Sequence, residues 1–380
     1  MQSLDAFARA KLAVLDAGGL RRTLVRTRRL DGPWVERNGK RYLSFSCNDY
    51  LNLTNHPAVK AAATEAIALY GTGAGASRLV TGDHPLMEEL EGRLAAFKGT
   101  EAACVFSTGY AANTGTIPTF VGERDHLFID ERAHACIWAG ARLSGAEAQA
   151  FRHNDLVDLE RRLSAADPRG ARLIVTEGVF SMDGDVAPLT ALAKVAERYG
   201  AWLMTDDAHG VGVLAEGRGT GGLFPDARVD LQMGTLSKAL ASAGGYVCGS
   251  RAAIDLIKTR ARTLVYSTGL PPASAAAALA ALQIIERDPG LCALPLATAR
   301  AFTRAANLPE ATSAIVPVIL GEPAAAMAAQ AVLEAEGFLV VAIRPPTVPV
   351  GTARLRLAFS AGHPDDEIER LAACVRKFAA

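Results

Sequence analysis

The sequence lacks an excess of charge and a patterned set of cysteines. Its 40 lysines and arginines balance 40 aspartates and glutamates, so the composition does not point to nucleic acid or to an anionic membrane surface. The six cysteines are scattered, with no Cys-x-x-Cys pair and no spacing that suits a metal ion. We therefore expect no metal site, and buried free thiols in a reducing cytoplasm.

A long apolar run is also missing. The alanine-rich run 273–285 is too short and too weakly apolar to cross a bilayer. Near the N-terminus, Asp5, Arg9, Lys11 and Asp16 interrupt the apolar positions, which predicts an amphipathic helix rather than a signal peptide. We therefore expect a cytoplasmic protein without a membrane segment.

The length and the element patterns predict an α/β protein of several parts. With 380 residues, half of them hydrophobic, the chain can bury a large core in two or three domains. We expect an N-terminal arm over residues 1–44, a large domain over 45–285 and a small α/β domain over 286–380. The arm should contain a helix to Leu15, a break at Gly18–Gly19 and a hairpin from Trp34 to Leu43. The small domain should contain strands at 315–320, 338–343 and 353–359.

One lysine lies in an unusual stretch, Asp230 to Gly245. A short apolar strand pattern runs into Gly-Thr-Leu-Ser-Lys-Ala at 234–239, and a run of small residues follows. Burial and a nearby cationic ring would lower the pKa of Lys238, and the hydroxyls of Thr235 and Ser237 could help to hold a phosphate. This setting suggests a lysine that forms a Schiff base with pyridoxal phosphate. Taken alone, a Ser-Lys pair more often belongs to a surface loop.

A second cluster makes the surface-loop interpretation less probable. The apolar run 201–204 predicts a buried strand, and Asp-Asp-Ala-His-Gly at 206–210 follows at the end where ligands bind in α/β sheets. Pyridoxal chemistry needs a carboxylate against the pyridine nitrogen, and Asp206 is placed for that role. His209 follows and could hydrogen-bond the phenolic oxygen of the ring.

These two motifs together resemble the α-oxoamine synthase family of fold-type I pyridoxal phosphate enzymes. The resemblance runs from about Leu20 to the C-terminus. It implies a large domain with a mostly parallel central sheet flanked by helices, and a smaller α/β C-terminal domain. It also implies pyridoxal 5'-phosphate bound as a Schiff base on Lys238, with Asp206, His209 and His134 among the catalytic residues.

The resemblance implies further cofactor contacts at strand ends. The strand pattern 102–106 ends in small residues that open a helix, so free N–H groups and the positive end of the helix dipole meet there. In the family this turn binds the cofactor phosphate, and His134 stacks on the ring. The cofactor-binding set so implied is Gly109, Tyr110, His134, Ser181, Asp206, His209, Thr235, Lys238 and Thr268. Thr268 reaches the cofactor of a neighbouring subunit in such enzymes, which implies a homodimer with shared active sites.

The resemblance also implies a set of substrate contacts: Arg21, Asn48, His134, Arg344 and Thr347. An arginine suits a free carboxylate, and three prolines around Arg344 restrict the backbone there. Arg344 is thus expected at the carboxylate of an amino acid, and Arg21 at the terminal carboxylate of an acyl chain. Asn48 could equally be a turn residue.

The implied reaction joins L-alanine to a pimeloyl thioester with loss of carbon dioxide. The surroundings of Arg21 and the segment 344–356 favour these substrates, while the acyl carrier is either coenzyme A or an acyl carrier protein. The sister enzymes glycine C-acetyltransferase, 5-aminolevulinate synthase and serine palmitoyltransferase share the residues matching Lys238, Asp206 and His209. Those three residues therefore cannot decide among these activities.

Two interpretations from other classes fit the sequence less well. Gly71 to Ala76 fits the spacing of a dinucleotide fingerprint, but the alanine-rich segment before it has helical spacing, whereas the fingerprint requires a strand. A catalytically silent partner subunit would lack the lysine, whereas Lys238 is present. The remaining histidines have no comparable neighbours and are expected to be structural: His56, His84, His126, His153 and His363.

Overall fold

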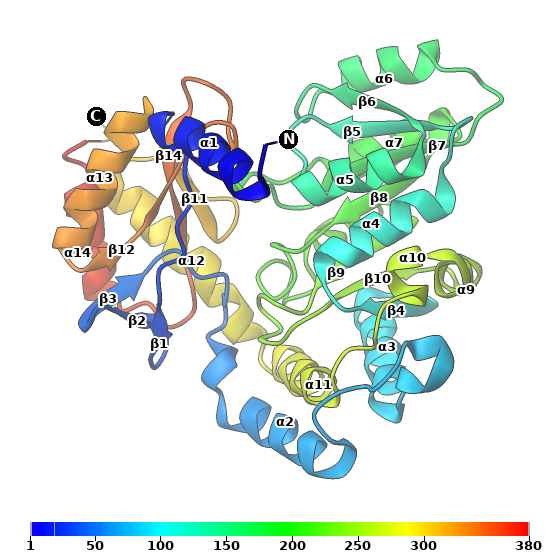
Figure 1. The fold of residues 1–380 in the computed structure, drawn as a ribbon, viewed down its shortest axis with the longest axis horizontal. Coiled ribbons are helices and arrows are strands. Elements are labelled where there is room, and N and C mark those ends of the chain that lie inside the picture. Colours follow the sequence, from blue (N-terminus) through cyan, green and yellow to red (C-terminus); the bar gives the residue numbers. More distant parts are fainter. Residues whose placement is uncertain (1, 19, 379–380) are drawn as a thin grey trace.

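The computed structural model describes residues 2–18 and 20–378, which form two lobes (Figure 1). The larger lobe, on the right of Figure 1, holds a seven-stranded sheet with helices on both faces, and the smaller lobe holds the C-terminal elements. This arrangement confirms the predicted fold class. Gly19, half of the predicted Gly18–Gly19 break, lies outside the described residues.

The large sheet is mostly parallel. Its strand order is β4-β10-β9-β8-β7-β5-β6, and β10 alone runs antiparallel to both of its neighbours. The strands are β4 (Ala102–Phe106), β5 (His126–Asp130), β6 (Glu147–Phe151), β7 (Arg172–Glu177), β8 (Trp202–Asp206), β9 (Leu231–Thr235) and β10 (Gly245–Gly249). Most of these strands are apolar throughout because helices cover both faces of the sheet.

Alternate residues of each strand supply the two faces. Leu173 and Val175 of β7 join a core with helices α4, α5 and α9, while Ile174 between them joins a core with α6 and α7. The helices are α4 (Gly109–Phe120), α5 (Ala135–Ser144), α6 (Leu156–Ala165), α7 (Leu189–Arg198) and α9 (Arg251–Arg260). A third core beside β10 includes α3 (Pro85–Lys98) and α11 (Pro272–Arg287). The helix α2 (Pro57–Tyr70) precedes the Gly71 loop, so the dinucleotide fingerprint has the wrong context.

Polar residues end the parallel strands at one edge of this sheet. Asp130, Glu177, Asp206 and Thr235 are the last residues of β5, β7, β8 and β9. Parallel strands bring their carboxyl ends together, and the register sets Glu177 directly beside Asp206. This edge faces the smaller lobe and positions the candidate site.

The smaller lobe combines the N-terminal hairpin with the C-terminal elements. Strands β11 (Ile315–Gly321), β14 (Ala353–Ala358) and β13 (Val341–Ile343) form one antiparallel sheet. The hairpin of β2 (Trp34–Arg37) and β3 (Lys40–Ser44) carries β1 (Arg28–Arg29) at its edge. Helices α12 (Pro289–Ala306), α13 (Pro323–Ala335) and α14 (Asp365–Val375) complete the lobe.

The single strand predicted over 338–343 was wrong. The chain changes sheets at Val340: β12 (Phe338–Leu339) pairs in parallel with β3, and β13 pairs with β14. Phe338, Val340 and Ala342 face one core, and Leu339 packs against Val35 and Tyr42, so the apolar run continues across the break and hydrophobicity alone does not show it. Phe45, next to β3, packs edge-on against Phe338 and Phe359 in that core, with ring centroids 5.9 and 5.5 Å apart.

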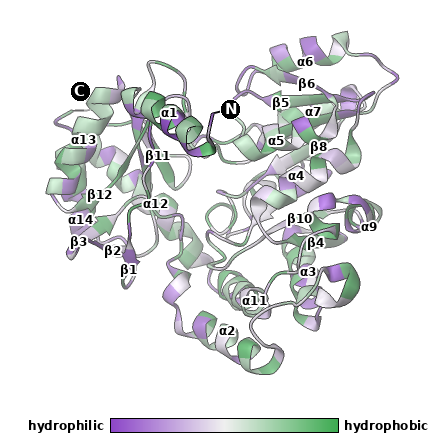
Figure 2. Cartoon of the chain, viewed as in Figure 1, coloured by the Kyte–Doolittle hydropathy of each residue, from purple (hydrophilic) through white to green (hydrophobic). Residues whose placement is uncertain are grey.

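The first helix, α1 (Leu4–Ala17), lies on the surface. Ser3 caps it by accepting a hydrogen bond from the N–H of Ala6, and all its residues are exposed. Figure 2 shows hydrophobic and hydrophilic residues alternating around helices such as α6, and a hydrophilic edge strand β1. Within residues 2–18 and 20–378, no helix combines the length and the apolar character needed to cross a bilayer.

Candidate active site

A cavity of about 240 Å³ opens at the carboxyl edge of the large sheet. It lies where the sheet topology of α/β proteins places ligands. Seven residues predicted from the sequence line it: Gly109, Tyr110, His134, Asp206, His209, Thr235 and Lys238. Ser237, whose hydroxyl was expected to help hold a phosphate, lines it as well, and so do Cys136 and Glu177, which were not predicted as site residues.

Lys238 lies in the tight turn that follows β9. Its carbonyl accepts a hydrogen bond from Ala241, and the N–H of Ser242 closes the turn on Leu236. Burial lowers the pKa of Lys238 below its ordinary value, although the negative charge of Asp206, and that of Glu177 when it is ionised, opposes this effect. A lysine with a lowered pKa is more readily the free amine that reacts with a carbonyl carbon.

The Asp206 carboxylate is held by donors at both of its oxygens. The side-chain amide of Asn113 donates to Oδ2 at 2.7 Å, and the N–H of Ala208 donates to Oδ1 at 3.1 Å. Asn113 lies on α4 and is fully buried, so the orientation of the carboxylate is set by the packing of that helix. An oriented buried carboxylate can accept a hydrogen bond from a protonated ring nitrogen.

His209 is buried beside Asp206 and is fixed by a tyrosine. The hydroxyl of Tyr50 lies 2.6 Å from Nδ1 of His209, and burial raises the pKa of Tyr50 to about 12. Burial, reinforced by the positive charge of Lys238, lowers the pKa of His209 well below its usual range. The imidazole is therefore neutral at physiological pH.

His134 caps the N-terminus of α5 and lies at the mouth of the cavity. Its Nδ1 accepts the N–H of Cys136 at 3.2 Å, so the ring proton is on Nε2. Partial burial lowers the pKa of His134, which keeps the ring neutral. The ring can therefore present its flat face or its Nε2–H to a ligand.

Glu177 is one of the cavity residues that the sequence did not predict. It is 2% exposed, its Oε2 accepts the N–H of Ser181 at 3.0 Å, and its Oε1 has no hydrogen-bond partner among the described residues. Burial and the adjacent charge of Asp206 raise the pKa of Glu177 to about 8. A neutral carboxyl thus lines the cavity near Lys238. The only signal in the sequence was its place at the end of a buried strand.

The N-terminus of α4 closes another side of the cavity. Thr108 caps this helix by accepting the N–H of Ala111 at 2.9 Å. A Cβ atom on Gly245 would lie 2.5 Å from the Cα of Gly109, so the first turn approaches β10 more closely than a side chain allows. The Thr235 hydroxyl donates to the carbonyl of Gly244 and lies 2.8 Å from the Ser237 hydroxyl. First-turn N–H groups and hydroxyls together form a setting that suits an anion.

Two of the other predicted residues are linked to the cavity by hydrogen bonds, Ser181 through one contact and Asn48 through two, by way of Tyr50 and His209. Ser181 is joined to it through Glu177. Asn48 accepts a hydrogen bond from Arg356 at 3.3 Å and lies 3.4 Å from the Tyr50 hydroxyl. Neither Tyr50 nor Arg356 was predicted, because their roles depend on contacts across the two lobes.

The remaining predicted residues do not line the cavity. Arg21 is exposed and pairs with Asp16 at 2.8 Å. Arg344 and Thr347 lie in the loop between β13 and β14, where the N–H of Thr347 donates to the carbonyl of Arg344 at 3.1 Å. Thr268 is exposed and forms an isolated antiparallel bridge with Ser77.

Comparison with known proteins assigns the chain to a family and identifies similar relatives. The chain belongs to the family "Aminotransferase class I and II", whose profile matches residues 40–375. A Caulobacter vibrioides protein named provisionally as an 8-amino-7-oxononanoate synthase is 66% identical over 380 residues, which cover 99% of this chain and 98% of that one. The 8-amino-7-oxononanoate synthase of Beijerinckia indica is 60% identical over 375 residues, covering 98% of this chain and 97% of that one.

Solved structures are similar over nearly the same length. Serine palmitoyltransferase of Sphingomonas wittichii matches with a TM-score of 0.90 and 31% identity, covering 99% of this chain and 98% of that one. A structure described as SPT with a PLP internal aldimine matches with a TM-score of 0.90 and 30% identity, at the same coverage. The 8-amino-7-oxononanoate synthase of Francisella tularensis matches with a TM-score of 0.77 and 28% identity, covering 88% of this chain and 97% of that one.

The raised pKa of Glu177 predicts a pH-dependent effect of its replacement. The folded protein holds the Glu177 proton up to about pH 8, whereas the unfolded chain loses it near 4.5. The contribution of this group to stability is therefore complete below pH 4.5 and is lost as the pH rises to about 8. Glu177→Gln keeps the shape of the neutral carboxyl and does not titrate.

We expect the ligand-free Glu177→Gln variant to gain stability relative to the parent protein as the pH rises from 5 to 8, by at most a few kcal/mol. Urea unfolding at both pH values measures this difference. A difference in unfolding free energy that stays constant with pH would show that Glu177 is ionised throughout.

Proposed function

We propose that this protein is a pyridoxal phosphate-dependent acyltransferase that condenses L-alanine with a pimeloyl thioester. The products are 8-amino-7-oxononanoate, carbon dioxide and the free thiol, in a step of biotin biosynthesis. The observation that carries the proposal is one cavity that holds the Lys238 amine and the oriented Asp206 carboxylate. The names of relatives 60–66% identical to the chain support the choice of substrates.

The residues present fit pyridoxal phosphate. The group needs an amine for its aldehyde carbon, a carboxylate for its ring nitrogen and an anion site for its phosphate. Lys238, Asp206 and the N-terminal turn of α4 at Gly109 and Tyr110 supply these at one cavity. When bound, the cofactor supplies a protonated ring that withdraws electrons from the bonds changed at the amino acid Cα.

Lys238 holds the cofactor and moves the proton of the amino acid. Its Nζ is the free amine more often than in an exposed lysine, because burial lowers its pKa. With the cofactor and L-alanine bound, the same Nζ would remove the Cα proton and later return one. The new carbon–carbon bond joins Cα to the thioester carbonyl carbon, and the thiol leaves. The carboxylate of alanine then departs as carbon dioxide.

Three other residues hold the ring of the cofactor. Asp206 accepts the hydrogen bond of the ring nitrogen, and its own orientation comes from Asn113. His209, fixed at Nδ1 by Tyr50, would hold the phenolic oxygen, and His134 would lie against the ring. Ser181 and Thr235 complete the set of cofactor contacts.

The carboxylate of each substrate needs a cationic partner, and the two arginines proposed here do not line the cavity. Arg344 binds the carboxylate of L-alanine, with Thr347 and Asn48 close to the substrates, and Arg21 binds the terminal carboxylate of the pimeloyl chain. A guanidinium can hold a carboxylate through two parallel hydrogen bonds. Arg21 lies on the exposed arm after α1, so substrate contact requires the arm to fold over the site.

We further propose a homodimer with shared active sites in the cytoplasm. Exposed apolar side chains gather along the sequence near the Ser77–Thr268 bridge: Leu79, Val80 and Tyr266 are 60%, 74% and 74% exposed. A second copy that covers them would bring Thr268 to the partner's cofactor phosphate. The six cysteines are all free, which fits a reducing compartment.

Turnover with matched substrate pairs tests the function. The purified protein, loaded with pyridoxal phosphate, is offered L-alanine with pimeloyl-coenzyme A or pimeloyl acyl carrier protein, and glycine with acetyl- or succinyl-coenzyme A. We expect 8-amino-7-oxononanoate from L-alanine and a pimeloyl thioester. Turnover only with glycine and acetyl- or succinyl-coenzyme A would assign the protein to a sister activity.

Borohydride reduction tests the role of Lys238. Reduction should bleach the visible absorbance and add the cofactor mass to the peptide that contains Lys238. We expect Lys238→Ala to lose this adduct and about 10²-fold to 10⁴-fold in kcat/KM, because a positioned proton-transfer group is removed. Lys194→Ala, at an exposed position of α7, is the control and should retain both properties. An adduct on another lysine would refute the assignment.

Sedimentation tests the dimer. We expect a species of twice the 39.8 kDa of one chain. Val80→Asp should dissociate it and lower cofactor affinity, because a charge would be buried in the interface. Val332→Asp, on an exposed apolar position of α13 in the other lobe, should not. A monomer that binds the cofactor and turns over normally would contradict the shared site.

A further inference from the structure

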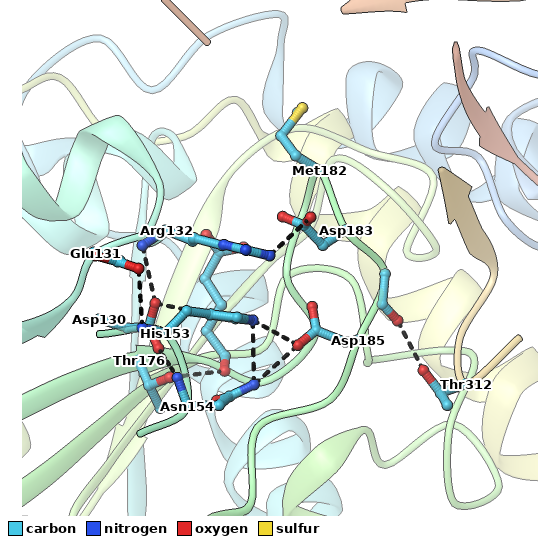
Figure 3. A network of polar contacts seen from close by, with 12 residues as sticks. Asp130, Glu131, Arg132, His153, Asn154, Thr176, Met182, Asp183, Asp185 and Thr312 are labelled. Atoms are coloured by element: carbon cyan, nitrogen blue, oxygen red, sulfur yellow. Dashed lines mark hydrogen bonds and ion pairs between the residues drawn. The ribbon is translucent and has the colours of Figure 1, made fainter. Parts of the chain in front are cut away.

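His153 follows β6 and lies between two carboxylates. Its Nδ1 is 3.0 Å from Asp130 Oδ1, and its Nε2 is 2.7 Å from Asp185 Oδ2 (Figure 3). Burial alone would lower the pKa of His153, but the hydrogen bonds to Asp130 and Asp185 outweigh it and raise the pKa to about 9. The ring is therefore an imidazolium that donates from both nitrogens. Asn154 binds the same two carboxylates, each at 2.9 Å.

One end of this arrangement is rigid and the other is a loop. Asp130 ends the buried strand β5 and is fully buried. Asp185 ends the loop Ser181–Asp185, which connects β7 to α7. The ring of Phe180, just before that loop, packs edge-on against His153 with centroids 4.4 Å apart. His153 therefore ties the loop to the central sheet.

The smaller lobe holds the same loop from the opposite side. Arg356 donates to the Ser181 carbonyl at 2.5 Å, and Arg354 donates to the Met182 carbonyl at 3.3 Å. Both arginines lie on β14 and are buried.

The next two residues of the loop have partners as well. Arg354 and Arg132 both bind Asp183 Oδ1, at 2.6 and 3.0 Å. Thr312 donates to the Gly184 carbonyl at 3.1 Å (Figure 3). Each of the five residues of the loop is thus held, and partners come from both lobes.

The loop also reaches the cavity. The N–H of Ser181 donates to Glu177, which lines the cavity beside Asp206. A shift of the loop would therefore move Ser181 and the Glu177 carboxyl together with the arginines of β14. Small displacements of groups near reacting atoms have large effects on rate.

We propose that His153 is a positioning residue for the reaction, which fixes the loop Ser181–Asp185 between the two lobes and so sets the geometry of the cavity wall. His153 is not among the residues that line the cavity. The kinetic part of this inference rests on the proposed function, whereas the order of the loop can be measured without it.

His153→Phe keeps a flat ring and removes both donors, so it leaves Asp130 and Asp185 without this partner. We expect faster amide hydrogen exchange in residues 180–187, retained cofactor absorbance, and a kcat lowered by about 10²-fold with much smaller changes in KM. Asp185→Asn keeps the shape of the side chain, and its amide oxygen can still accept from His153 and Asn154, but it removes the negative charge beside His153. It should show the same effects in weaker form, and it carries the test if His153→Phe does not fold.

Ile254→Ala is the matched control, since Ile254 is a fully buried residue of α9 on the other face of the sheet. It should lower the melting temperature while exchange in residues 180–187 and kcat stay unchanged. Normal loop exchange and a kcat within about twofold of the parent in the His153 and Asp185 variants would overturn the proposal. If the parent lacks the proposed activity, the exchange measurement alone still decides whether His153 orders the loop.

Discussion

Two buried carboxyl groups, Glu177 and Asp206, stand side by side at the ends of paired strands. If both groups were ionised, their negative charges would repel each other strongly in this buried site. Lys238 and the hydrogen-bond donors around Asp206 offset part of this repulsion. The surroundings of the two groups differ. Asp206 receives two hydrogen-bond donors, whereas Glu177 receives one and has a raised pKa. The pKa values of the other groups around the cavity are related to this difference between Asp206 and Glu177.

The neutral state of the surrounding groups is part of the same balance. His209 and His134 have lowered pKa values, and Tyr50 has a raised one, so none of the three adds a charge near neutral pH. Asp206 and Lys238 are then the two groups of the cavity lining that can carry a charge near neutral pH. Such a distribution suits a bound group that itself carries charge on a ring and on a phosphate.

The sequence predicted the elements that repeat a simple pattern. The strand that ends at Asp206 and the strand 102–106 follow from their apolar runs, and the motifs around Asp206 and Lys238 indicate one shared edge of a sheet. Contacts between distant segments were not predictable. Asn113 orients Asp206 across 93 positions of sequence, and Arg356 reaches Ser181 across 175. No local pattern encodes such pairs, and the break at Val340 was hidden for the same reason.

The pairing of β12 with β3 makes the smaller lobe a joint product of both ends of the chain. Phe338 and Leu339 lie beside Leu43 and Ser44, so this lobe lacks a strand until nearly nine-tenths of the polypeptide exists. During synthesis the large sheet, complete by Gly249, can assemble first. The hairpin of β2 and β3 pairs with β12 only after Leu339 has been added. The order of translation thus separates formation of the cofactor-facing edge from formation of the lobe that closes over it.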